Sequence, residues 1–362
     1  MQSAVIQEIE HATITASYEQ GPTDAPLLVR TIGERLQHVT ERFSGREALV
    51  VRHQCYRATY RELSEQVALA ARALIASGVS KGDRVGIWAA NRYEWVVVQF
   101  ATARVGAVLV TINPAYQAAE LQYALRKAGV SLLFTARGFR DADYVAMLDQ
   151  ARAHCPDLGK IVVLDGEWQS FLAEGVRVDP RRLTEREASL DPNDAINIQY
   201  TSGTTGLPKR ATLSHRNILN NGHFTAEVLR YSEHDRVCVP VPFYHCFGMV
   251  LGNLAAMTHG ACVVVPAESF DAHAVLEAVQ TERCTSLYGV PTMFIAELTE
   301  PELDEFDLTS LRTGIMAGAP CPVEVITQVR ARMHMDQITI GCGMTETAPV
   351  ARRDADRRRR PR

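Results

Sequence analysis

The chain has 362 residues, 46% of them apolar, which is enough to bury a large core and to form more than one subdomain. Its 38 basic and 42 acidic side chains give a formal net charge of -4, so the composition indicates neither nucleic acid nor an anionic membrane as a partner. The eight cysteines include no C-x-x-C pair, and no basic-then-apolar signal sequence opens the chain, so we expect a soluble cytoplasmic protein with reduced thiols.

The first half of the chain predicts alternating helices and strands. Residues 1–25 show no firm period and are expected to form an irregular arm, followed by one large domain over residues 26–350. Thr59 and Glu62 form a capping box, which starts a helix that ends near Gly78. The other elements expected here are helices at Leu28–Phe43, Glu94–Ala103, Glu120–Lys127 and Asp143–Ala153, and strands at Val85–Trp88, Ala107–Ile112 and Lys160–Leu164. This rhythm indicates parallel strands covered by helices.

A polar and charged connection follows over residues 165–194 and contains two prolines. We expect it to join two sheet-containing subdomains. Ile196, Ile198 and Tyr200 then alternate as in a short buried strand.

The stretch from Tyr200 to Lys209, the first motif, has the composition of a phosphate-binding loop between a strand and a helix capped by Ser214. Its glycines let backbone N–H groups approach an anion, its hydroxyls donate hydrogen bonds, and its lysine adds a positive charge. These candidate ligands are Thr201, Ser202, Gly203, Thr204, Thr205, Gly206 and Lys209. A Walker A loop needs Ser or Thr after the lysine, and Arg210 stands there instead.

The second half of the chain continues the alternation. Residues 237–267 contain no Asp, Glu, Lys or Arg, but prolines, glycines and histidines interrupt them, so a buried strand, turn, helix and strand are expected rather than a membrane span. Peripheral contact with a membrane is left open. The expected helices are Arg216–Arg230, Met249–Met257, Ala272–Glu282, Thr292–Leu298 and Val323–Met333, and the expected strands are Val237–Val241, Ala261–Val265, Thr285–Tyr288, Thr313–Ala317 and Gln337–Gly341.

These elements predict an α/β fold with two parallel-rich sheets packed with helices. The active site is expected along the carboxyl ends of the strands. No cysteine or histidine pair falls at the spacing of zinc ligands, so no zinc-type site is predicted.

Three further stretches in this half carry candidate site residues. The second motif, Gly343 to Thr347, follows a strand and offers the hydroxyl of Thr345 and the carboxylate of Glu346. Gly318 and Ala319 follow another strand, and by spacing alone they form an ordinary strand-to-helix turn. His245 stands among aromatic residues, where a packed core histidine is an equally good interpretation.

Between Tyr60 and Val350 the chain resembles the AMP-forming adenylating enzymes, and among them most closely the fatty acyl-CoA synthetases. The resemblance implies that the first motif binds the phosphates of ATP. It also implies that Thr345 contacts phosphate and that Glu346 holds Mg²⁺. Gly318 and Ala319 would line the adenine pocket and acyl channel, and His245 would gate the acid site.

Two residues depart from the family pattern. Arg210 replaces the usual glycine, which costs roughly 1 to 2 kcal/mol if the backbone there needs a positive φ, although its charge could add a phosphate contact. Cys342 replaces the usual aromatic residue before the second motif. The stacking partner for adenine is therefore left open.

The implied activity is ligation of a fatty acid to coenzyme A, driven by ATP with Mg²⁺, through an acyl-AMP intermediate. An aryl- or amino-acid-adenylating enzyme and a non-catalytic, nucleotide-binding remnant are the alternatives. The family continues into a Thr-Gly-Asp element and a domain with a catalytic lysine, whereas no Thr-Gly-Asp occurs here and no lysine follows Lys209. We therefore expect a truncated ligase with impaired catalysis and a disordered, arginine-rich tail over residues 351–362.

Overall fold

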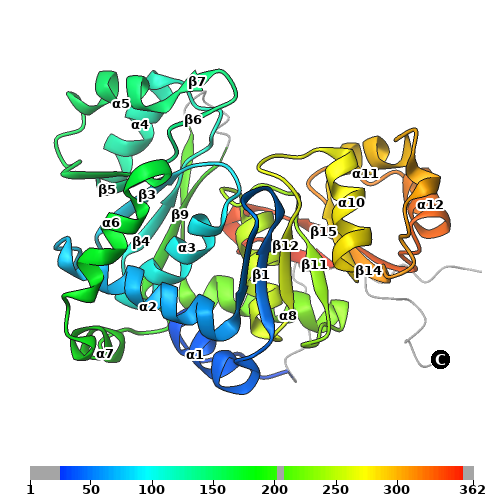
Figure 1. The fold of residues 1–362 in the computed structure, drawn as a ribbon, viewed down its shortest axis with the longest axis horizontal. Helices are drawn as coiled ribbons and strands as arrows, with labels where there is room; N and C mark the ends of the chain where they lie inside the picture. Colours follow the sequence, from blue (N-terminus) through cyan, green and yellow to red (C-terminus); the bar gives the residue numbers. More distant parts are fainter. Residues whose placement is uncertain (1–24, 202–207, 354–362) are drawn as a thin grey trace, which may run out of the picture.

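The computed structural model describes residues 25–201 and 208–353. It has the expected α/β fold, with two large, mostly parallel sheets and helices packed around them (Figure 1). The predictions for the arm over residues 1–24, for Ser202 to Gly206 and for residues 354–362 lie outside the described residues.

The six-stranded sheet has the order β10-β9-β4-β3-β5-β8. Its neighbouring strands are parallel except for β9 and β10. The strands are β3 (Arg84–Trp88), β4 (Val108–Thr111), β5 (Val130–Thr135), β8 (Lys160–Val163), β9 (Ala195–Thr201) and β10 (Lys209–Ser214). The expected strand before the first motif is confirmed, and it is buried on both faces because Asn197 and Gln199 are covered as well as Ile196 and Ile198.

The eight-stranded sheet has the order β16-β15-β14-β13-β11-β12-β1-β2. The strands are β1 (Glu47–Val51), β2 (Tyr56–Thr59), β11 (Arg236–Cys238), β12 (Cys262–Val265), β13 (Ser286–Gly289), β14 (Thr313–Ala317), β15 (Gln337–Gly343) and β16 (Val350–Arg353). Sequence analysis did not predict β1 and β2, which pair beside β12. The amino-terminal part of the chain therefore completes the sheet of the carboxy-terminal half.

The expected disorder of residues 351–362 is wrong for its first residues, because residues 351–353 belong to β16. This strand pairs antiparallel with β15. Backbone hydrogen bonds to a sheet edge need no apolar side chains, so composition alone did not reveal the strand.

Helices begin where side chains cap them. The capping box of Thr59 and Glu62 is confirmed at the start of α2 (Tyr60–Ala76). The helix expected from Leu28 begins later, as α1 (Ile32–Phe43), because the hydroxyl of Thr31 accepts a hydrogen bond from the backbone N–H of Glu34. The other helices of this half are α3 (Tyr93–Val105), α4 (Ala118–Ala128) and α5 (Tyr144–Arg152).

The connection over residues 165–194 is not the boundary between the two sheets. Most of it forms α6 (Leu164–Val176) and α7 (Pro180–Ala188). Trp168 and Phe171 of α6 pack in the core, and β9 and β10 beyond it belong to the same sheet as β3. Its charged side chains suggested a linker because they occupy the outer faces of two amphipathic helices.

The charge-free residues 237–267 form buried elements of the fold. They contribute most of β11, the π-helix η2 (Phe247–Leu254), α9 (Ala255–Thr258) and β12. The helix α8 (His215–Leu229) packs against η2 and α9. Within the described ranges, no helix combines the length and the apolarity that crossing a membrane requires.

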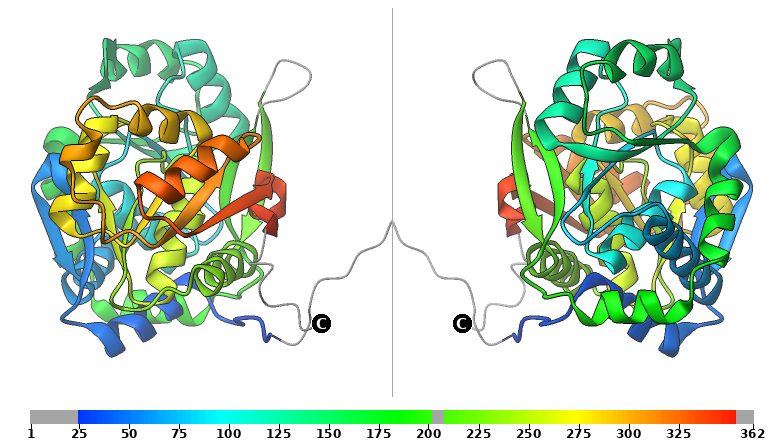
Figure 2. Two further views of the ribbon diagram at one scale, coloured as in Figure 1. Left: turned by 90° about the vertical axis from the view of Figure 1, so that its right-hand side faces the viewer. Right: turned by 90° about the vertical axis from the view of Figure 1, so that its left-hand side faces the viewer.

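A second core lies on the other side of the eight-stranded sheet. It is covered by α10 (Ala272–Glu282), α11 (Pro291–Leu298) and α12 (Val323–Arg332), which Figure 1 shows at the right. On the opposite flank, β9 and β10 lie beside the turn that follows β15, as the two views of Figure 2 show. The two motifs of the sequence therefore meet at one edge of the molecule.

Candidate active site

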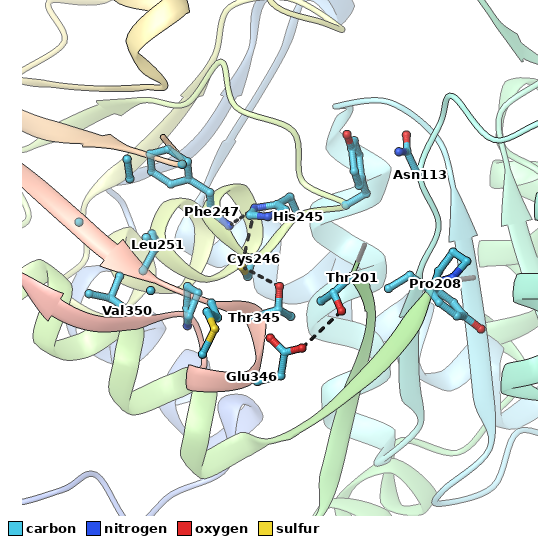
Figure 3. Close-up of a pocket in the computed structure, with 18 of the residues that line it drawn as sticks. Asn113, Thr201, Pro208, His245, Cys246, Phe247, Leu251, Thr345, Glu346 and Val350 are labelled. Carbon is cyan, nitrogen blue, oxygen red and sulfur yellow. Dashed lines mark hydrogen bonds between the residues drawn. The ribbon is translucent and has the colours of Figure 1, made fainter. Parts of the chain in front are cut away.

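A cavity of about 750 Å³ opens where the carboxyl ends of strands from both sheets meet (Figure 3). This volume lies within the range of about 300 to 1,000 Å³ that is typical of small-molecule sites. The cavity is lined by Asn113, Tyr116, Tyr200, Thr201, Pro208, Tyr244, His245, Cys246, Phe247, Leu251, Ala317, Gly318, Gly341, Gly343, Met344, Thr345, Glu346, Pro349 and Val350.

The first motif joins two antiparallel strands rather than a strand and a helix. Lys209 already belongs to β10 and lies opposite Thr201 of β9. The helix α8 comes only after β10, and Ser214 caps it as expected. Glycine-rich sequence fits either connection, so the sequence could not separate a hairpin from a strand-to-helix turn. Thr201 lines the cavity, whereas the exposed side chain of Lys209 is outside its lining.

The strain hypothesis for Arg210 is wrong. This residue lies in β10 opposite Tyr200, and its φ is not positive. Its guanidinium donates a hydrogen bond to the backbone carbonyl of Lys127 at the end of α4. The hydroxyl of Tyr200 donates to the carbonyl of Ala124 at 2.6 Å, so the base of the hairpin is tied to the same helix end.

The second motif forms a tight turn between β15 and β16, the 3₁₀-helix η4 (Thr345–Thr347). Thr345 is buried, whereas Glu346 is exposed to the cavity. The hydroxyl of Thr201 donates a hydrogen bond to Oε1 of Glu346 at 3.3 Å, which joins the first motif to the second (Figure 3). Hydroxyl and carboxylate oxygens are the ligands that Mg²⁺ prefers, so these residues fit the metal that the resemblance implies.

Asn221 of α8 supports the second motif from behind. Its side-chain amide donates to the carbonyls of Val350 at 2.9 Å and Thr347 at 3.5 Å, and its Oδ1 accepts from the N–H of Val350 at 3.2 Å. Sequence analysis did not single out this residue. An asparagine inside a helix gives no sign of the distant backbone that it contacts.

His245 lies at the wall of the cavity with its imidazole fixed by a backbone contact. Nδ1 accepts a hydrogen bond from the N–H of Phe247 at 3.1 Å, so Nε2 carries the hydrogen of the neutral ring. The side chain is exposed toward the cavity, yet the surrounding protein still withdraws water from the ring and lowers the pKa of His245. A neutral imidazole that donates from Nε2 suits a contact with a substrate oxygen.

Cys246 lies between His245 and the second motif. Its sulfur is 3.7 Å from His245 Nδ1 and 3.7 Å from the hydroxyl oxygen of Thr345. Burial raises the pKa of the Cys246 thiol to about 11, so it stays protonated at neutral pH. We interpret it as a neutral part of the wall rather than as a nucleophile.

Of the turn after β14, Gly318 lines the cavity and Ala319 does not. Gly318 has a φ of 86°, and a Cβ there would meet Val290 at 3.0 Å, so this close turn favours glycine.

Asn113 and Tyr116, which also line the cavity, come from the loop after β4 and were missed. Their signal was an Asn-Pro turn directly after a buried parallel strand.

Comparison with known proteins identifies the family to which the chain is similar. Residues 36–362 match the family described as AMP-binding enzyme. The chain is 41% identical over 359 residues to the medium-chain acyl-CoA ligase ACSF2, mitochondrial, of Danio rerio, a match that covers 93% of this chain and 59% of that protein. It is 42% identical over 346 residues to the putative acyl-CoA synthetase YngI of Bacillus subtilis (strain 168), a match that covers 90% of this chain and 63% of that protein.

Solved structures show the same fold. The anthranilate CoA ligase AuaEII, in complex with anthranoyl-AMP, matches 91% of this chain and 62% of its own with a TM-score of 0.79 and 24% identity. The long-chain-fatty-acid-CoA ligase FadD1 of Archaeoglobus fulgidus matches 94% of this chain and 69% of its own with a TM-score of 0.80 and 20% identity. The resemblance inferred from the two motifs is thus confirmed, and the chain belongs to the AMP-binding enzyme family.

Proposed function

We propose that this chain binds ATP with Mg²⁺ in the cavity and activates a fatty acid as an acyl-adenylate for ligation to coenzyme A. The observation that carries the proposal is the contact of Thr201 with Glu346, because it brings the two motifs of the family to one cavity. The chain spans 59% and 63% of the length of the two relatives described above, so we assign their complete activity to this chain only as a proposal.

In this proposal the first motif holds the triphosphate. Thr201, Lys209 and the loop from Ser202 to Gly206 supply hydroxyl, ammonium and backbone donors to its oxygens. Thr345 contacts phosphate from the opposite sheet, and Glu346 would hold Mg²⁺. When bound, the ion would offset the charge that moves onto the leaving pyrophosphate.

The acid enters beside His245. An oxygen of its carboxylate attacks the α-phosphorus of ATP, the bond from that phosphorus to the bridging oxygen breaks, and pyrophosphate leaves. His245 orients the carboxylate through Nε2, and Gly318 lines the nucleotide and acyl sites. Phe247 and Leu251 give that part of the cavity an apolar wall.

The lining of the cavity favours a fatty acid over an amino acid. Among the described residues around the cavity, Glu346 is the one carboxylate. The ammonium group of an amino acid would therefore have to share Glu346 with Mg²⁺ as its acidic partner. The relatives named medium-chain acyl-CoA ligases favour an acid of medium length.

A cytoplasmic location for this reaction is also a proposal. It is supported by eight cysteines that are all free, as expected in a reducing compartment.

Acid-dependent exchange of labelled pyrophosphate into ATP tests the proposal with the chain as it exists. We expect exchange with octanoate and Mg²⁺, and weaker exchange with benzoate or phenylalanine. Exchange with benzoate alone would establish an aryl-adenylating enzyme instead. ATP binding without exchange for any acid would establish a non-catalytic nucleotide-binding protein.

A further inference from the structure

Two histidines and a glutamate gather outside the cavity, at the contact between α8 and the end of α9. His223 and Glu227 lie one turn apart on the same face of α8, and His259 follows α9 directly. One ligand atom from each of the three side chains lies within 4.8 Å of the other two. No part of the proposed reaction uses these residues.

His259 and Glu227 are in direct contact. Nε2 of His259 lies 2.9 Å from Oε1 of Glu227, and its Nδ1 lies 3.0 Å from the hydroxyl oxygen of Thr258, which is also 2.8 Å from the carbonyl of Ala255. A nitrogen lone pair and a carboxylate oxygen at 2.9 Å have either a proton or a metal ion between them.

His223 completes the arrangement. Its ring stacks on that of His259, with centroids 5.1 Å apart and planes 18° apart, and its Nε2 lies 4.0 Å from Oε1 of Glu227. Its Nδ1 is buried without a hydrogen-bond partner in the described part of the chain. Apart from its contact with Glu227, the His223 imidazole is given no polar partner within the described residues.

From this geometry we propose a binding site for a zinc-like divalent transition-metal ion, formed by His223, Glu227 and His259. Imidazole and carboxylate are zinc ligands, and two atoms bound to one ion at about 2.1 Å lie about 3.4 Å apart at the tetrahedral angle that zinc prefers. The separations from Oε1 of Glu227, 2.9 Å to His259 and 4.0 Å to His223, lie on either side of this value, so small side-chain movements would bring the three atoms to one ion. Water completes the coordination, since Glu227 is 57% exposed.

The surroundings support the site and also limit its affinity. The hydroxyl of Thr258 orients His259, as hydrogen-bonded partners of metal ligands commonly do. Arg35 of α1 donates to the carbonyl of Thr258, and its positive charge opposes a second cation nearby. A bound ion would tie α8, which supports the second motif through Asn221, to the turn after α9. Sequence spacing does not indicate this site, because His259 is distant from α8 in the sequence.

Zinc competition with a chromogenic chelator tests the proposal on the full, reduced chain without a polyhistidine tag. We expect one zinc equivalent to bind to the wild type, and His259→Gln and Glu227→Gln to weaken that binding at least about tenfold. His234→Gln and Glu233→Gln are matched controls, because these residues form another surface His–Glu contact, at 3.5 Å, and should leave zinc binding unchanged. The cysteines are the same in every variant, so zinc bound by thiolates contributes equally.

Equal zinc affinity in the wild type and both site variants would overturn the proposal. So would the lack of any bound zinc, since a proton alone then bridges His259 and Glu227. Melting temperatures without zinc show whether each variant folds. Glu227→Gln keeps the test valid if His259→Gln does not fold, because Glu227 is exposed and Gln preserves its shape.

Discussion

Glu346 offers the cavity an exposed carboxylate that already accepts a hydrogen bond from the other motif. Removing its charge should weaken Mg²⁺-dependent binding of ATP and slow pyrophosphate exchange by roughly 10² to 10³-fold, because a preorganised charge at the reacting phosphates is lost. Calorimetry and the exchange assay on Glu346→Gln measure both effects. Glu185→Gln, an exposed change on α7, is the control, and equal activity in the two variants would remove Glu346 from the site.

Glu297 of α11 is fully buried, and neither carboxylate oxygen has a hydrogen-bond partner among the described residues. Burial raises the pKa of Glu297 well above its ordinary value. The folded state therefore holds the proton more tightly than the unfolded state. At low pH the side chain is neutral and no charge is buried, whereas rising pH makes Glu297 destabilise the fold.

Glu297→Gln should consequently gain stability relative to the wild type with rising pH. The gain is about 1.4 kcal/mol for each pH unit above the ordinary pKa, until the folded-state pKa is reached. Melting temperatures between about pH 5 and about pH 8 measure the difference. A difference between the two proteins that does not change with pH would show that Glu297 is not a buried acid.

The sequence predicted the site residues whose hydroxyl or carboxylate groups can bind phosphate or a metal ion. Thr201 ends β9 directly before the glycine-containing loop, Thr345 and Glu346 stand in the turn after β15, and the structure brings all three to one cavity. Asn221 could not be found in this way. Its role depends on which backbone lies opposite it, and that is decided by packing between distant segments.

At the scale of elements, α8 connects the two motifs, since its start follows β10 and its Asn221 holds the turn before β16. Asn221→Ala should weaken ATP binding by roughly 1 to 3 kcal/mol, because up to three hydrogen bonds to Thr347 and Val350 are lost. Asn221→Asp keeps the acceptor but sets a carboxylate oxygen against the carbonyls of Val350 and Thr347, so it should lose at least as much. ATP titrations of both variants, with Asn193→Ala in an exposed turn as the control, test this; an unchanged affinity in Asn221→Ala would refute the positioning role.

The hairpin of β9 and β10 leads to a second prediction at this scale. Arg210→Gly should lower stability by about 1 kcal/mol, because it removes the contact with Lys127 and places a flexible glycine in a strand. It should not improve ATP binding. Thermal melts and ATP titrations measure both quantities. A more stable variant with tighter ATP binding would restore the strain hypothesis.

Elements with a strong local period could be predicted, whereas two edge strands rich in charged or polar residues could not. The helix at Ala272–Glu282 and the strand at Thr313–Ala317 have the expected bounds. In contrast, β10 and β16 are edge strands with charged residues, which resemble loops in sequence. Their pairing depends on the backbone of a neighbouring strand.

For the whole molecule, the order of strands is what the sequence could least reveal. Each sheet combines segments from distant parts of the chain, so β1 and β2 join β12, and β9 joins β4. The cavity exists because these two sheets meet at the carboxyl ends of their strands.

The central claim is that Thr201 of one sheet and Glu346 of the other act together on ATP, and a double-mutant cycle on acid-dependent pyrophosphate exchange tests it most directly. The rates are measured for the wild type, Thr201→Val, Glu346→Gln and the double variant. Residues in contact at a shared ligand should show a coupling free energy of roughly 0.5 to 3 kcal/mol. Strictly additive effects of the two substitutions would contradict the claim that the two motifs form one site.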